Sequence, residues 1–360
     1  MRFQAALAVA LAVFVSGCSM RTPHESLNAA LEKSFRAQGY DYTSSTRITK
    51  LSVSHDKTDE TDRSAVYVDK GLSILRSLSL QAKGSVDIRQ ARSEALYDLR
   101  YAQNNVEVSV RVPLMADYEN RVLYIGNSFL NTLFPMRPED EKKLIRFDLN
   151  DTMMQSFFPE DAFNASAFRS MNRAIQEGTL KGFAEMNGSL AYYDAASGNI
   201  RVRLDHDDSV GWFVRFSDAA IVRLFQDGVL SKEEYGAYMI LSDQKRISAL
   251  FERFVLATDF EIALNRSGRV ERVTVRLDIS DAEGSFMAGI ENTMSIEHYD
   301  DPHFTLDPEK AGTVHFHDVV KNFEMLMEPV NTLDKIFQEP ADVNDALGVL
   351  PSALKTHRVL

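Results

Sequence analysis

The sequence has few cysteines, a deficit of positive charge and no long apolar run, and each shortage excludes a class of protein or structure. It holds one cysteine among 360 residues, so no intrachain disulfide is expected and the fold must be stable through its core alone. Its 52 acidic residues outnumber 40 basic ones, and the net charge of −12 argues against nucleic acid and against attraction to anionic lipid headgroups. No apolar run reaches the roughly 20 residues that a helix needs to span a bilayer.

Motifs that carry catalysis are also missing. The sequence shows no Gly-x-Ser-x-Gly nucleophile elbow, no glycine-rich phosphate loop and no dinucleotide fingerprint. Its acidic residues alternate along predicted strands, which is typical of a solvated face and not of paired catalytic carboxylates. The sequence therefore predicts a protein that is not an enzyme and that needs no cofactor.

The N-terminus carries the most specific signal. Arg2 precedes an apolar run over residues 5–15, which has the length of a secretory h-region. The run ends in Val15-Ser16-Gly17-Cys18, which resembles the bacterial lipobox, in which the cysteine thiol is lipidated and the bond before it is cut. We expect a signal peptide over residues 1–17 and a lipid on Cys18, with 343 residues left after cleavage. The alternative is an ordinary secretory peptide with an incidental cysteine.

The residues after Cys18 predict where the lipid places the body. In lipobox signals an aspartate after the cysteine favours inner-membrane retention, so Ser19 predicts the outer membrane, with the periplasmic face favoured over the surface. Thr22, Pro23 and Glu25 match the N-cap, N1 and N3 positions of a helix with a capping box. Residues 18–23 would then be a short tether, in which the three residues before Thr22 reach about 10 Å.

Most of the remaining pattern has a period of two residues. Apolar and polar side chains alternate over residues 80–88, 106–112, 200–205 and 272–279, which indicates antiparallel strands with one buried face. Residues 195–199 and 265–268 match hairpin turns between such strands. Helical patterns are fewer, at residues 163–180, 218–227 and 243–256.

These patterns predict an α+β fold. A one-sided sheet of about nine or more strands tends to curl, and its apolar face needs the helices as cover. We expect a large curved antiparallel sheet, a half-open β-barrel, with helices over its concave face. This β-cup would occupy residues 24–318, and a helical extension broken by prolines would occupy residues 319–360.

The chain resembles the superfamily of bacterial lipoproteins and lipoprotein carriers that includes LolA, LolB, LppX and LprG. The likeness lies in the helix over residues 23–37, the strand–turn–strand stretch over residues 122–148, the helical stretch ending near Leu256, and the meander over residues 259–275. It covers roughly residues 24–300. The resemblance implies a half-open barrel that holds lipid or acyl chains on an apolar concave face.

Aromatic and methionine side chains are the candidates for contact with such a ligand, since flexible thioethers suit varied apolar ligands. The alternative for each of them is ordinary core packing. The candidate residues are Tyr124, Phe129, Phe134, Met153, Met154, Phe157, Phe158, Trp212, Phe251 and Phe254.

Metal-binding patterns are weak. His315 and His317 would share one face of a strand, but spacing marks no third ligand, so no metal site is predicted and structural or solvent-facing histidines are favoured. Asp205-His206-Asp207-Asp208 departs from the calcium-loop pattern and is expected to be a charged hairpin tip.

Two functions remain open from the sequence. The first is a membrane-anchored lipoprotein that binds lipid or another hydrophobic ligand without catalysis. The second is a structural or assembly lipoprotein that acts through contacts with envelope proteins. A metal-dependent enzyme using His315 and His317 is a weaker third hypothesis.

Overall fold

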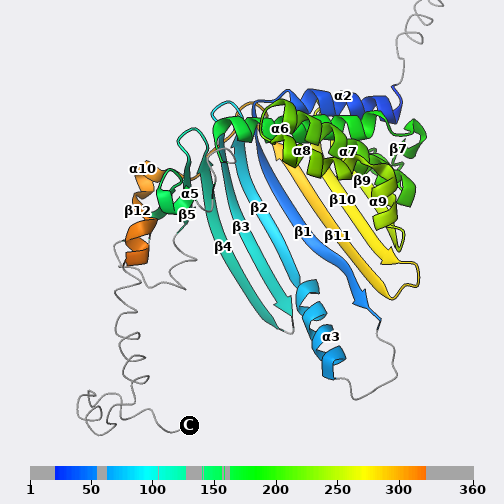
Figure 1. Cartoon of the computed structure of the whole chain (residues 1–360), viewed down its shortest axis with the longest axis horizontal. Helices are drawn as coiled ribbons and strands as arrows, with labels where there is room; N and C mark the ends of the chain where they lie inside the picture. Colours follow the sequence, from blue (N-terminus) through cyan, green and yellow to red (C-terminus); the bar gives the residue numbers. More distant parts are fainter. Residues whose placement is uncertain are drawn as a thin grey trace, which may run out of the picture.

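The computed structural model describes residues 21–54, 63–103, 105–126, 140, 142–155, 158 and 163–321. Its fold is α+β, built on one sheet of 12 strands in the order β12-β6-β5-β4-β3-β2-β1-β11-β10-β9-β8-β7. Neighbouring strands are antiparallel except β12 and β6, which are parallel. The sheet is not closed, because β12 and β7 lie at opposite ends of the strand order (Figure 1).

The strands confirm the alternating segments of the sequence and add several that the pattern did not single out. They are β1 (Gly39–Val53), β2 (Leu78–Asp87), β3 (Arg92–Gln103), β4 (Val106–Asp117), β5 (Val122–Gly126), β6 (Leu144–Asp148), β7 (Ala191–Tyr193), β8 (Ile200–Leu204), β9 (Phe254–Leu264), β10 (Val270–Asp281), β11 (Phe286–Glu297) and β12 (Thr313–His315). The predicted hairpin turns join β7 to β8 and β9 to β10.

The helices are mostly short. They are α2 (Pro23–Phe35), α3 (Arg63–Arg76), α5 (Thr152–Gln155), α6 (Ala165–Ala184), α7 (His206–Gln226), α8 (Lys232–Tyr238), α9 (Gln244–Leu250) and α10 (Pro308–Ala311). The capping box of α2 is confirmed: Glu25 N donates to Thr22 Oγ1 at 3.2 Å, and Thr22 N donates to Glu25 Oε2 at 2.9 Å. None of the helices in the described ranges is both long and apolar enough to cross a membrane.

The register divides the sheet into two chemically different faces. One row of paired positions runs Phe260, Val275, Asn292, Thr46, Leu80, Leu99 and Val110 from β9 to β4. The adjacent row on the other side runs Arg276, Glu291, Arg47, Ser79, Arg100 and Ser109. We call these sides the apolar face and the polar face. On the polar face, cross-strand ion pairs join Glu291 to Arg47 and to Arg276.

Helices pack against the part of the apolar face that β8 and β9 form. Leu27 and Leu31 of α2 and Phe183 of α6 pack with Ile200, Val202, Phe260 and Ile262 of the sheet in one buried cluster. A second cluster joins Val210 and Val214 of α7 and Ile247 of α9 to Leu256 of β9. In Figure 1 these helices lie at the end of the long strands where β1 begins, and α3 lies at the opposite end. We call these the near end and the far end.

Glycines allow α6 and α7 to pack closely. A Cβ added at Gly178 would lie 2.7 Å from the carbonyl oxygen of Phe216, and one added at Gly182 would lie 2.8 Å from Trp212 Nε1. Both distances are shorter than a Cβ tolerates, so a side chain at either position would push the two helices apart. This contact seats Trp212 against Phe183 and Phe260 in the buried cluster.

Three sequence predictions of local structure are wrong. Residues 205–208 are not a hairpin tip: they begin α7, with Asp205 as its N-cap accepting from Asp208 N at 3.1 Å. The helical pattern over residues 243–256 ends at Leu250, and Phe254 lies in β9, because pairing with β10 satisfies its backbone. His315 and His317 do not share a strand, since β12 ends at His315 and the chain becomes helical at Phe316.

The chain between β11 and β12 crosses the polar face as a strap, residues 298–307. Three carboxylates hold it near the ends of β1 and β3. Asp300 accepts from Gln38 N at 2.9 Å, and Asp41 accepts from His303 N at 2.8 Å. Buried Glu94 accepts from the backbone N–H groups of Thr305 and Leu306 at 3.0 and 2.8 Å. The strap thereby brings β12 beside β6, where β12 forms one edge of the sheet, within the predicted β-cup range.

Candidate functional site

Part of the apolar face is exposed. At the far end, Leu80 is 38% exposed, Leu99 44%, Ile290 45%, and Val106 and Val108 53% each. The five residues come from β2, β3, β11 and β4, and the register places all of them on the apolar face. We call them the open apolar surface. Exposed apolar patches larger than a few hundred Å² are uncommon on soluble monomers and mark binding sites for proteins, membranes or ligands.

The same strands are buried at their near end. On β3, Ala95 is 4% exposed, although it shares its face with Leu99, four residues further along the strand. On β4, Ala116 is 2% exposed and shares its face with Val108. Strand pairing is continuous from one end to the other, so the difference arises from what packs on the face and not from the strands themselves.

More apolar side chains lie around the open apolar surface. Phe254 of β9 is partly exposed on the same face and meets Phe286 of β11 edge to face, with ring centroids 6.2 Å apart. Helix α3 contacts β1 and exposes Val68, Ile74 and Leu75. The far end therefore presents apolar side chains from both the sheet and α3. Figure 1 shows α3 at this end of the sheet.

A polar cluster of Asn292, Ser44 and Thr46 interrupts the apolar face. The side-chain amide of Asn292 donates to Ser44 Oγ at 2.9 Å and to Thr46 Oγ1 at 2.7 Å across the β11–β1 pair. These bonds satisfy the amide N–H groups within the sheet, so the polar atoms do not need water to be stable there.

The tyrosines at the near end sit in an apolar environment. Burial, with smaller contributions from the neighbouring Tyr97 and Tyr40, raises the pKa of Tyr42 to about 12. Tyr40 lies against both Tyr42 and Tyr299, with ring centroids 6.5 and 6.4 Å apart. Their hydroxyls stay neutral at physiological pH, so this part of the face adds no charge.

The predicted ligand-contacting residues do not form one pocket. Trp212 is in the buried cluster of α2, α6 and the sheet, Phe251 packs against the second cluster, and Phe254 alone borders the open apolar surface. Met154 is buried in α5, Phe158 meets Phe163 at 5.9 Å, and Tyr124 lies on the polar face of β5. Phe129, Phe134 and Phe157, the side chain of Met153, and Cys18 lie outside what the structure describes.

Leu80, Val106 and Val108 of the open apolar surface belong to segments whose alternation predicted strands, and the alternation predicted that they would be buried. Leu99 and Ile290 lie in β3 and β11, which the pattern did not single out. The aromatic residues were predicted as ligand contacts, yet large aromatic side chains are also the ones that pack best in a core. Only the tertiary structure shows which side chains of the apolar face remain exposed.

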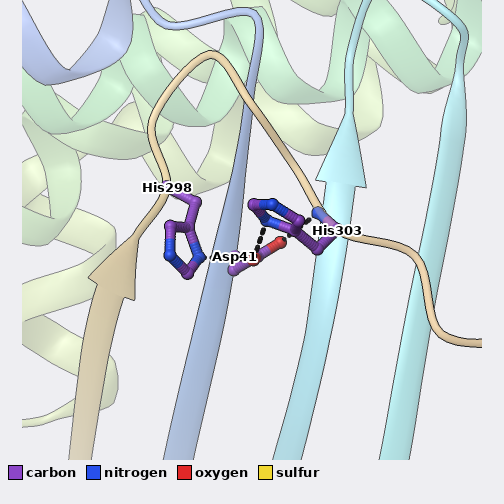
Figure 2. Close-up of side chains that lie close together, drawn as sticks. All are labelled: Asp41, His298 and His303. Atoms are coloured by element: carbon purple, nitrogen blue, oxygen red, sulfur yellow. Dashed lines mark hydrogen bonds and ion pairs between the residues drawn. The ribbon is translucent and has the colours of Figure 1, made fainter.

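A group of metal-ligating side chains lies on the polar face instead. Asp41 of β1 meets His298 and His303 of the strap, and the ligand atoms of all three lie within 4.8 Å of one another (Figure 2). In the part of the chain that the structure describes, neither His315 nor His317 belongs to such a group of three. This site could not be predicted from residue spacing, because about 260 residues separate Asp41 from the two histidines.

Comparison with known proteins adds no family to this description, because no protein-family model and no curated protein sequence matches the chain.

Proposed function

We propose that the protein is a membrane-anchored, non-catalytic lipoprotein that holds the acyl chains of a lipid against its open apolar surface. In this proposal the sheet is a half-open barrel, the apolar face is its concave side, and the helices cover the near end of that side only. Cys18 carries the lipid anchor, and Ser19 directs the chain to the periplasmic face of the outer membrane.

The observation that carries the proposal is the partial exposure of Leu80, Leu99, Val106, Val108 and Ile290 on one face of adjacent strands. Each methylene of a ligand that leaves water for such a surface contributes about 0.8 kcal/mol. Ten methylenes would thus contribute up to about 8 kcal/mol before the cost of ordering the chain, which is enough for stable binding. A long acyl chain fits this surface better than a compact ligand, because the surface extends across several strands.

In this proposal the lipid anchor keeps the apolar face close to the membrane that supplies its ligand. Helix α2 begins at Pro23, with its capping box at Thr22, so only three residues separate Cys18 from the folded body. A lipidated Cys18 would hold the sheet within about 10 Å of the membrane surface. An acyl-chain-binding surface at that distance can receive its ligand from the membrane or return it there.

Native mass spectrometry of the mature protein, purified from its own membrane, tests the proposal. We expect a mass above that of the polypeptide and its anchor, and we expect organic extraction to remove the excess. A protein that shows only the mass of the polypeptide and its anchor before extraction would contradict ligand binding. Stable crosslinks to envelope proteins in cells, without an extractable ligand, would support the assembly role instead.

A matched pair of variants locates the ligand. Leu99→Glu places a carboxylate on the open apolar surface, and Leu96→Glu places one on the polar face of the same strand, at a residue of similar exposure (40% against 44%). We expect Leu99→Glu to lose most of the bound lipid, because an ionised group beside an acyl chain is poorly solvated. Leu96→Glu should retain it. Equal retention by both variants would place the ligand elsewhere.

A further inference from the structure

The strap and β1 together bring three potential metal ligands to one point on the polar face. The Nδ1 atom of His298 lies 2.8 Å from Asp41 Oδ2, and that of His303 lies 3.1 Å from the same oxygen. The two imidazole rings meet edge to face, with centroids 4.5 Å apart. Figure 2 shows both rings directed at the carboxylate from the loop that leaves β11.

The other oxygen of Asp41 is already engaged, and this orients the carboxylate. Asp41 Oδ1 accepts from His303 N at 2.8 Å and lies 2.6 Å from Ser85 Oγ. The carboxylate is 19% exposed, whereas the imidazoles of His298 and His303 are 54% and 56% exposed. Oδ2 is therefore held toward the rings, and the rings remain open to solvent and to an incoming ion. Outer hydrogen bonds of this kind orient ligating groups in metal sites.

The backbone of the strap supports the same arrangement. His298 has φ of 48° and Asp300 has φ of 69°, both in the left-handed region that residues other than glycine rarely adopt. Asp300 is fixed there, because it accepts from Gln38 N at 2.9 Å and pairs with Arg269 at 2.8 Å. The resulting turn places His298 and His303 on the polar face of the sheet, beside Asp41.

The ligand chemistry selects a class of ion. Two imidazole nitrogens and one carboxylate oxygen suit Zn²⁺ and neighbouring transition metals, whereas Mg²⁺ and Ca²⁺ prefer all-oxygen sites. Zinc bonds of about 2.0–2.2 Å place neighbouring ligand atoms about 3.3 Å apart in a tetrahedral site. The two N···O separations need to open by a few tenths of an ångström, and rotation of the exposed rings can bring their Nδ1 atoms together.

We propose that Asp41, His298 and His303 bind a zinc-class divalent cation through one carboxylate oxygen and two imidazole nitrogens. Three protein ligands leave a fourth position open, and a hollow of about 360 Å³ beside them is lined by Lys83, Glu94 and Glu297 among others. The cation replaces the protons that the two rings share with Asp41 Oδ2, and it fastens the strap to β1. The site lies on the face opposite the open apolar surface, so it is independent of the lipid proposal.

Zinc titration of untagged, metal-free protein tests the site. Isothermal titration calorimetry and metal analysis after dialysis should both give one Zn²⁺ per chain, and Mg²⁺ should not bind. His298→Asn and His303→Gln should each weaken zinc binding at least tenfold. Asparagine suits the left-handed backbone at position 298, and His298 is largely exposed, so neither the turn nor the core should suffer.

A double variant, His315→Ala with His317→Ala, is the matched control, since it removes two histidines and leaves the proposed ligands in place. It should bind zinc as the unaltered protein does. Absence of zinc binding in the unaltered protein would overturn the proposal. So would binding that survives both His298→Asn and His303→Gln, or binding that only the control variant loses. Melting temperatures without zinc should differ little among the variants, because each single ligand variant loses one exposed hydrogen bond to Asp41, and this separates loss of a ligand from loss of folding.

Discussion

The near and far ends of the apolar face differ although the strands are the same. Ala95 and Leu99 lie on one face of β3, yet Ala95 is buried and Leu99 is 44% exposed. Ala116 and Val108 repeat this contrast on β4. Alternation in the sequence determines which face of a strand is apolar, but what packs on that face determines how much of it becomes core. Over β8 and β9 the packing comes from α2, α6, α7 and α9. The comparison shows that an apolar strand face is not always an interior.

The largest predicted effect separates the covered from the open part of the face. Ile262 is 2% exposed, so Ile262→Ala should lower the free energy of unfolding by about 2–5 kcal/mol. Leu99→Ala, at an exposed position of the same face, should lower it by about 1 kcal/mol or less. Urea unfolding of ligand-free protein measures both. Equal losses would mean that Leu99 is covered in solution.

The helical cover itself depends on the close contact of α6 with α7. Gly182→Ala should lower the free energy of unfolding by about 1–3 kcal/mol, because the new methyl group would collide with the Trp212 indole. Gly236→Ala in α8 is the control, since a Cβ at that position meets nothing within 4 Å. It should be neutral, or it should stabilise the helix by up to about 1 kcal/mol. Thermal unfolding distinguishes the two, and a neutral Gly182→Ala would show that the helices can separate without cost.

The start of α2 should contribute less than the core does. Thr22→Ala removes the oxygen that accepts from Glu25 N and should cost about 1 kcal/mol in the free energy of unfolding. Thr22→Ser retains a hydroxyl oxygen and should cost a few tenths of that amount. Chemical unfolding of the two variants measures the difference. If both unfold like the unaltered protein, the capping box does not stabilise the near end.

The smallest effect concerns the strap on the polar face, and it depends on pH. Burial opposes ionisation of Asp41, but hydrogen bonds from Ser85, from the backbone of His303 and from both imidazoles outweigh it and lower the pKa of the carboxyl below its usual 3.8. A lowered pKa in the folded state means that the stabilisation is present above about pH 4 and is lost as the pH falls through the folded-state pKa. Asp41→Asn should therefore differ most from the unaltered protein at neutral pH.

Melting temperatures measured between pH 2 and 7 test this pH dependence. The gap between the two proteins should narrow as the solution becomes acidic, because Asp41 is then protonated in the unaltered protein too. A gap that stays constant down to pH 2 would show that the ionised carboxylate does not hold the strap. Glu94→Gln provides a comparison on the same strap, since Glu94 anchors Thr305 and Leu306.

Several elements could be predicted from the sequence because their signals are local. The Thr22–Glu25 capping box, the hairpin turns at residues 195–199 and 265–268, and the alternating strands each depend on residues within one turn or one strand, and the structure confirms them. The errors arose where local signals compete. Residues 251–256 carry a helical stripe and a strand alternation at once, and pairing with β10 decided between them from residue 254 onward. The capping box Ser231–Glu234 of α8 is another local signal of this kind.

By itself, the sequence determined that the sheet has one apolar and one charged face, because side chains of a strand alternate between its two sides whatever surrounds them. It also determined where α2 begins, because a capping box acts over three residues. Only the tertiary structure decided which part of the apolar face stays open and that Asp41 meets His298 and His303. Both depend on packing between segments far apart in the chain, and the spacing of residues along one segment carries no record of that packing.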